Sequence, residues 1–190
     1  MFALYAEVRA APDSAAAWAH WCMTRDELFR THPSSPLDAN GRASFPGVPY
    51  FGYDPALRVA ARIESLPSEG GRIGSSAVEP IAFERFAAAH FSVAGAECEL
   101  ELYWLTAYGG GVFVPFRDET SGRETYGGGR YLLDTVKGTD LGMDAERLVL
   151  DFNFAYNPSC SYDPRWVCPL SPPANRLPVA VRAGEQMPQL

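Results

Sequence analysis

The strongest polar cluster of the sequence lies in the segment DFNFAYNPSC, residues 151–160. On a strand, Asp151 and Asn153 project from one face, while the phenylalanine that follows each of them projects from the other. Asn157 precedes a proline, where the chain is expected to turn. A carboxylate beside amide groups can act as a general base or accept hydrogen bonds from a ligand. The alternative is that these side chains satisfy buried backbone groups or pair with an arginine.

A second polar cluster, YGGGRY, covers residues 126–131. Consecutive glycines let backbone N–H groups approach an anion, but this segment lacks the spacing of a phosphate-binding loop. Glycines inside a strand more often mark a bulge or make room for a large neighbour, such as Phe113. Tyr126, Arg130 and Tyr131 flank the glycines, so all three are candidates to contact a ligand in the space beside them.

Taken together, the two clusters predict a cavity lined by aspartate, asparagine, arginine and tyrosine side chains. An arginine anchor favours a ligand that carries a carboxylate or a phosphate, so binding of a small anionic molecule is the first hypothesis. The alternative is an enzyme, a hydrolase or an isomerase, in which Asp151 is the base, Arg130 stabilises charge and Tyr126 is a further catalytic candidate. A third hypothesis is a structural or partner-binding protein whose polar residues only satisfy the core.

The cysteines Cys160 and Cys168 are separated by seven residues. This spacing is not that of a zinc knuckle, and a structural metal needs four ligands, for which His32 is a further weak candidate. A stable disulfide is not expected in a cytoplasmic protein. Two separately packed thiols are the main interpretation, and a redox-labile pair is the alternative. We therefore predict no metal and no cofactor.

The clearest expected element is an α-helix that begins near Asp13 or Ser14 and ends before Pro33. Its apolar residues recur at helical spacing and form one stripe around Trp21. Arg25 lies on the same stripe. Because a buried guanidinium needs partners, Arg25 should meet a carboxylate or backbone carbonyls, and contact with a ligand is the alternative.

Short strands are expected along most of the remaining chain. Glutamates alternate with apolar residues over 97–102, which is the cleanest strand pattern of the sequence. Residues 57–63, 148–153 and 177–181 are expected to be further strands. The glycine- and serine-rich residues 67–76 are expected to be a loop.

Residues 112–133 are expected to form a hairpin around a four-residue turn. Its register places Asp118 opposite Arg123 and Arg117 opposite Glu124, which pairs opposite charges across the strands. Many short antiparallel strands and one helix predict a mainly β fold. The expected architecture is an antiparallel barrel-like or sandwich domain with one N-terminal α-helix packed on it.

The chain has 190 residues, of which 47% are hydrophobic, and it is expected to form a single domain that ends in a loose tail at 186–190. Its net charge of −7 argues against nucleic acid and anionic membrane surfaces as partners. The N-terminus lacks the pattern of a signal peptide, and no apolar run is long enough to span a membrane. We expect a soluble, cytoplasmic protein whose partner is a small molecule.

Three stretches of the sequence are distinctive when they occur in this order: RDELFRTHPSSPL (25–37), FVPFRDETSGRETYGGGRY (113–131) and DFNFAYNPSCSYDPRWVCPLSPPANRLPVAVRAGE (151–185). In combination they resemble a prokaryotic family known as the domain of unknown function DUF1684. The resemblance covers about residues 18–185 and implies no particular reaction or ligand. Residues 1–12 lie outside it, and we expect them to add an edge strand.

Overall fold

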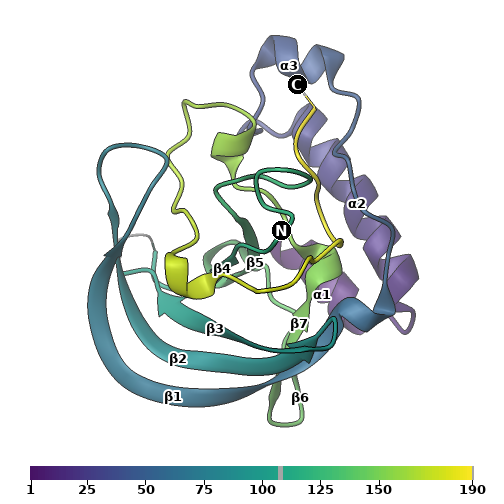
Figure 1. The fold of residues 1–190 in the computed structure, drawn as a ribbon. Coiled ribbons are helices and arrows are strands. Elements are labelled where there is room, and N and C mark those ends of the chain that lie inside the picture. The colour runs from purple at the N-terminus through teal and green to yellow at the C-terminus, as the bar shows by residue number, and fades with distance from the viewer. Residues whose placement is uncertain (107–108, 190) are drawn as a thin grey trace.

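The structure, a computed structural model, describes residues 1–106 and 109–189 (Figure 1). Within these residues, seven strands form one antiparallel sheet in the order β5-β4-β3-β2-β1-β7-β6. The strands are β1 (Arg58–Ile73), β2 (Ile81–Val93), β3 (Ala96–Trp104), β4 (Val112–Phe116), β5 (Arg130–Asp134), β6 (Met143–Asp144) and β7 (Arg147–Asp151). The mainly β prediction is confirmed. The sheet is curved but open, so a barrel or a sandwich describes it only loosely.

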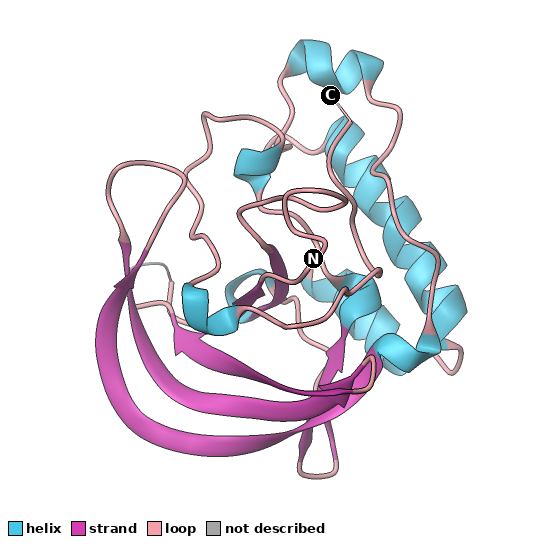
Figure 2. Ribbon diagram, in the orientation of Figure 1, coloured by secondary structure: helices cyan, strands magenta, loops and turns pink. Residues whose placement is uncertain are grey.

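The helices are α1 (Phe2–Ala10), α2 (Ser14–Thr31) and α3 (Ala39–Ser44), with short 3₁₀ turns η1 (Pro55–Leu57), η2 (Thr135–Lys137), η3 (Phe152–Phe154), η4 (Ser159–Ser161) and η5 (Pro173–Asn175). Of these, α2 and α3 lie on the opposite side of the molecule from the three long strands (Figure 2). The expected N-terminal helix is α2. The Asp13 carboxylate caps it by accepting from the N–H of Ala15 at 2.9 Å, and the helix ends before Pro33, both as predicted. Within the described chain, no helix combines the length and apolarity needed to cross a membrane.

The edge strand expected within residues 1–12 is wrong, because this segment forms helix α1. Leu4, Tyr5 and Val8 are buried and lie on one helical face. They pack in the same apolar cluster as Trp21 of α2. Burial against α2 therefore favours helix over an added strand.

The hairpin of β2 and β3 confirms the alternating pattern predicted for residues 97–102. Cys98, Leu100 and Leu102 are buried, while the glutamates between them face outward. The turn consists of Ala94 and Gly95, both with positive φ, as a tight two-residue hairpin turn requires.

The loop expected at residues 67–76 is wrong, because β1 continues through it to Ile73. The glycines here serve packing. A Cβ on Gly71 would lie 2.9 Å from the ring of Phe83, its partner on β2. A register shift between Ser65 and Glu69 interrupts the pairing with β2, and such irregularities let a long strand bend.

The predicted register of the 112–133 hairpin is also wrong. β4 and β5 pair with Phe116 opposite Arg130, and residues 117–129 leave the sheet as a long excursion. Gly129 has a φ of +96°, and a Cβ there would lie 2.7 Å from the carbonyl oxygen of Phe116. The backbone thus turns sharply back into the sheet at a position that only glycine fits.

Both predicted cross-strand charge pairs are wrong for the same reason. Asp118 contacts Arg130 at 3.2 Å, and Glu124 contacts Arg182 at 2.8 Å. Asp118 is fully buried, because the C-terminal segment covers the start of the excursion. A buried carboxylate needs a partner inside the protein, which the exposed Arg123 does not provide.

The strand expected at 148–153 is shorter than predicted, since β7 ends at Asp151 and η3 follows. Asp151 caps η3, so Asp151 and Asn153 do not project from one face of a strand. The strand predicted at 177–181 does not form. This segment still hydrogen-bonds to the excursion of residues 117–129, where Leu177 N–H donates to the Arg117 carbonyl at 2.8 Å. Prolines in this region remove donors that a continued ladder needs.

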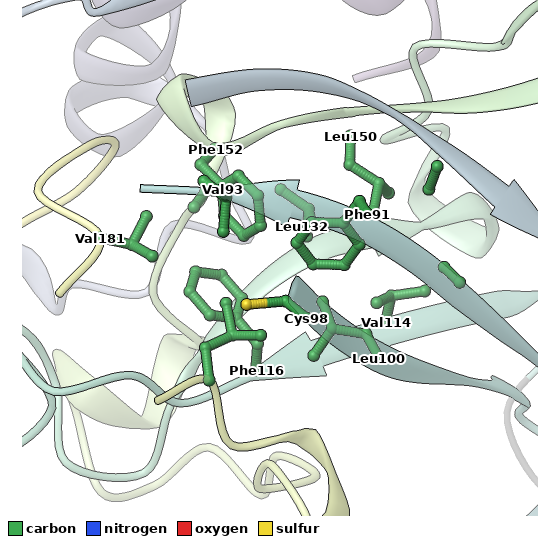
Figure 3. Packing of buried hydrophobic residues seen from close by; sticks show 14 of the residues in the cluster. Phe91, Val93, Cys98, Leu100, Val114, Phe116, Leu132, Leu150, Phe152 and Val181 are labelled. Carbon is green, nitrogen blue, oxygen red and sulfur yellow. The ribbon is translucent and has the colours of Figure 1, made fainter. Parts of the chain in front are cut away.

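The C-terminal segment closes over the main apolar core (Figure 3). Val181 belongs to this core together with Phe116 and Leu132 of the sheet and Phe152 of η3. Of the expected loose tail, Gln186 N–H donates to the Pro49 carbonyl at 2.8 Å, and the N–H of the next residue is bonded as well. Residue 190 lies outside the described chain. The segment therefore continues to make backbone contacts beyond residue 185.

Candidate functional site

A cavity of about 740 Å³ lies between the C-terminal half of α2, the region of β4 and β5, and residues 156–169. This volume is in the range of small-molecule sites. Aromatic side chains form much of its wall: Phe29, Phe113, Tyr131, Tyr156, Tyr162 and Trp166.

The cavity receives only part of the polar set predicted from the sequence. Three of the predicted ligand-binding residues line it, namely Arg25, Tyr131 and Asn157. Four others are not part of its wall, namely Tyr126, Arg130, Asp151 and Asn153. The fold thus separates the residues that the sequence predicted to line one cavity.

Arg25 is held by a carboxylate, as predicted. Its Nε donates to Glu185 Oε1 at 2.7 Å, and the other oxygen of Glu185 accepts from Asn157 N–H at 2.7 Å and from the Tyr162 hydroxyl at 3.0 Å. Burial, the largest single effect, works to lower the pKa of Arg25, but the Glu185 carboxylate together with nearby tyrosines raises that pKa above its usual value. The charge of Arg25 is therefore already balanced inside the protein.

Arg130 joins the sheet to the C-terminal segment. Its guanidinium contacts Asp118 at 3.2 Å, donates to the carbonyls of Val181 at 2.9 Å and of Ala183, and lies over the ring of Phe116. Burial lowers the pKa of Arg130, while the Asp118 carboxylate opposes that effect. With 1% of its surface exposed, Arg130 has no open side toward a ligand.

Asp151 and Asn153 hold the segment before β1 against the end of β7. Asp151 accepts from the Asn153 side chain at 2.8 Å and from Arg58 at 3.1 Å. Asn153 in turn bonds both the N–H and the carbonyl of Asp54, at 2.9 and 2.8 Å. Burial raises the pKa of Asp151, and the hydrogen bonds from Asn153 and Arg58 oppose it. Asp151 does not line the cavity, and its catalytic role stays a prediction.

Two buried oxygen atoms belong to cavity-lining residues and have no hydrogen-bond donor within the described chain. Asp134, 2% exposed, uses Oδ2 to contact Lys137 at 2.8 Å, while its Oδ1 is unpaired. Asn157, 3% exposed, donates from Nδ2 to the Gln186 carbonyl at 2.8 Å, while its Oδ1 is unpaired. Sequence reasoning missed Asp134. The sequence feature that could have identified it is an aspartate directly after the apolar run of β5.

Arg72 is a second cavity residue that sequence reasoning missed, because it falls in the segment expected to be a loop. It comes next to last in β1, is exposed, and donates to the Pro80 carbonyl at 3.1 Å. No carboxylate of the described residues lies within ion-pair distance of it. The wall also contains Glu79, so the mouth carries charges of both signs.

The weak metal candidates do not form a ligand set. Cys168 and His32 line the cavity, but the Nδ1 atom of His32 accepts from Ser34 N–H at 3.0 Å. Cys160 lies next to Cys168, and both are free thiols. Over residues 1–106 and 109–189, no three histidine, cysteine, aspartate or glutamate residues are grouped so that they can hold a metal ion.

A family model described as "Protein of unknown function (DUF1684)" matches residues 43–186, which is more than half of the chain. The chain belongs to this family. A solution NMR structure of an uncharacterized protein from Haloarcula marismortui is similar to it, with a TM-score of 0.64 and 32% identity, covering 90% of this chain and 92% of that chain. No curated protein matches the chain significantly.

The DUF1684 match contains two of the three motifs on which the resemblance was based. The third, residues 25–37, lies before the first matched residue. Arg72, Asp134 and Asn157 fall inside the DUF1684 region, whereas the α2 side of the cavity lies outside it. The cavity wall therefore combines the family region with the helix that precedes it.

Proposed function

We propose that the protein binds a small organic molecule in this cavity. The observation that carries the proposal is the pair of unpaired, buried oxygen atoms on residues of its wall, Asp134 Oδ1 and Asn157 Oδ1. Leaving a buried polar atom without a partner costs about 1–3 kcal/mol. A ligand that donates hydrogen bonds to these atoms recovers that cost, and the cavity is large enough to contain one.

The wall indicates the class of ligand. Aromatic side chains favour a flat or apolar body. The two acceptors favour a hydroxyl or amine group on the buried side. At the exposed side, Arg72 is a cation without a carboxylate partner in the described residues, which favours an acidic group. The proposed ligand is therefore a small organic acid with an apolar body and one donor group.

This proposal keeps the anionic ligand of the sequence analysis but changes its anchor. Arg25 and Arg130 are neutralised by Glu185 and Asp118, so Arg72 takes that role. The net charge of −7 supports a small molecule rather than nucleic acid or an anionic membrane as the partner. A cytoplasmic location is part of the proposal and is supported by four free thiols, which that compartment maintains.

Three matched probes test the proposal by thermal shift and calorimetry. Para-hydroxyphenylacetate has the acid, the ring and the donor; phenylacetate lacks the donor; tyrosol has a neutral alcohol in place of the acid. We expect the first to bind most tightly, with about a ten-fold loss in affinity for each missing group. Equal affinity for all three, or binding of none, overturns the proposed ligand class.

Variants locate the binding. Arg72→Ala should weaken para-hydroxyphenylacetate but leave tyrosol unchanged, while Asp134→Asn should weaken both. Arg147→Ala is the matched control, because Arg147 is exposed on β7 and is not part of the cavity wall. If Arg147→Ala weakens binding as much as Arg72→Ala, the effect is one of overall charge and the site assignment is wrong.

A further inference from the structure

The segment that closes one side of the cavity carries two cysteines in contact. The backbone N–H of Cys160 donates to Cys168 Sγ at 3.4 Å, so the Cys168 sulfur lies directly against Cys160. Cys160 belongs to η4 and is half-buried, whereas Cys168 is 9% exposed. The two cysteines are thus in contact although seven residues separate them in sequence.

Each cysteine is held by contacts outside this pair. The Tyr126 hydroxyl lies 3.8 Å from Cys160 Sγ. The N–H of Cys168 donates to Ser76 Oγ at 3.0 Å, and Ser76 N–H donates to the Cys168 carbonyl at 2.9 Å. The loop before β2 therefore fixes Cys168, while the Tyr126 hydroxyl faces the sulfur of Cys160.

We propose that Cys160 and Cys168 form a peroxide-reactive dithiol, in which Cys160 is the attacking thiolate and Cys168 the resolving thiol. This goes beyond ligand binding and does not depend on it. A small oxidant suits a half-buried sulfur, because a bulky disulfide has less access to it.

The surroundings of the two sulfurs divide their roles. Contact with the Cys168 side chain, with smaller contributions from Ser76 and Tyr126, outweighs burial and lowers the pKa of Cys160 to about 6. The same contact and burial raise the pKa of Cys168 far above its usual value. Burial raises the pKa of Tyr126 to about 12, so its phenol keeps its proton and can donate to the thiolate. Cys160 is also the more exposed of the two and the one that the Tyr126 hydroxyl faces, so it is the nucleophile, and Cys168 holds the proton.

The reaction balances in two steps. Cys160 thiolate attacks one oxygen of hydrogen peroxide, the O–O bond breaks, and the hydroxide released takes a proton to give water; the sulfur loses two electrons and becomes a sulfenic acid. Cys168 then loses its proton and attacks that sulfur. The S–S bond forms, the S–O bond breaks, and the departing hydroxide takes a proton to give a second water.

Intact mass and peptide mapping test the proposal on the full chain, reduced and then treated with hydrogen peroxide. We expect a loss of about two daltons and a single Cys160–Cys168 disulfide. Cys168→Ala should stop at a sulfenic acid on Cys160 that dimedone traps. Cys22 and Cys98 are internal controls, because burial raises the pKa of both thiols. A disulfide that involves either control, or no disulfide at all, overturns the proposal.

Tyr126→Phe separates a reactive site from two thiols that merely pack together. It removes only the hydroxyl, so the fold should remain intact, which circular dichroism checks. The midpoint pH of Cys160 alkylation should move upward, and peroxide oxidation at pH 6 should slow several-fold. An unchanged midpoint overturns the assigned role of this contact. If oxidised glutathione forms the disulfide as fast as peroxide does, the assigned oxidant is wrong.

Discussion

Replacing Glu185 with alanine should destabilise the protein more than removal of any exposed charge. Glu185 is fully buried, and its two oxygens accept from the Arg25 side chain, from the N–H of Asn157 and from the hydroxyl of Tyr162. The variant leaves the Arg25 guanidinium, which is 7% exposed, without a counter-charge. It also removes a link between α2 and the C-terminal segment.

The size of the loss follows from the state of Arg25 after the substitution. Removing one partner of a buried ion pair typically costs about 3–5 kcal/mol. The unpaired N–H and hydroxyl add to this cost, although the terms are not additive. We expect a loss of about 4 kcal/mol, which is a large part of the total stability of a domain. The double variant Arg25→Met/Glu185→Leu should recover much of it, because no unpaired charge remains buried.

Urea unfolding followed by tryptophan fluorescence measures the loss of unfolding free energy. Trp21 is a suitable probe because its ring centroid lies 5.1 Å from the Arg25 guanidinium. Glu124→Ala is the matched control. Its partner is Arg182, and the side chains of this pair are 40% and 61% exposed, so the variant should unfold close to the wild type. If Glu185→Ala behaves like Glu124→Ala, Arg25 is not held for stability, and its role as a ligand contact becomes the better interpretation.

Gly129→Ala should lower the free energy of unfolding in urea by at least about 1 kcal/mol, because alanine is strained at a positive φ. Gly52→Ala, the control, should leave that free energy nearly unchanged, because no atom lies within 4 Å of the position its Cβ would take. Asn153→Ala should cost about 2 kcal/mol by the same measurement, because it leaves both backbone groups of Asp54 unpaired. Labelling of Cys160 by iodoacetamide, read by peptide mass spectrometry, should remain fast at pH 7 and slow as the pH falls through about 6, since only the thiolate reacts.

Local sequence patterns were sufficient where short-range physics determines the structure. The cap at Asp13 and the stop before Pro33 defined α2, and the alternation around Leu100 defined β3. The same reasoning placed Arg25 on a buried face and required a carboxylate or backbone carbonyls as its partner. It did not identify Glu185, which lies 160 positions later in the chain.

The predictions were wrong where contacts between segments distant in sequence determine the local structure. The glycines of β1 and of the 127–129 run suggested loops and bulges without showing which side chains they accommodate. Gly71 makes room for Phe83, and Gly129 lets the chain turn back into the sheet. Asp134 and Arg72 were missed because the cavity forms only when α2, the sheet and the C-terminal half meet. These contacts depend on long-range packing, which a local sequence pattern does not predict.

An NMR titration of the isotope-labelled protein with para-hydroxyphenylacetate tests the central claim most directly. The account predicts a saturable one-to-one interaction that shifts the amide signals of Phe113, Tyr131 and Asn157 and leaves those of the β6–β7 hairpin unchanged. Arg72→Ala should reduce the affinity without altering which signals move. No saturable shift, or shifts that cluster away from the cavity wall, would contradict the claim that this cavity is a binding site for a small organic acid.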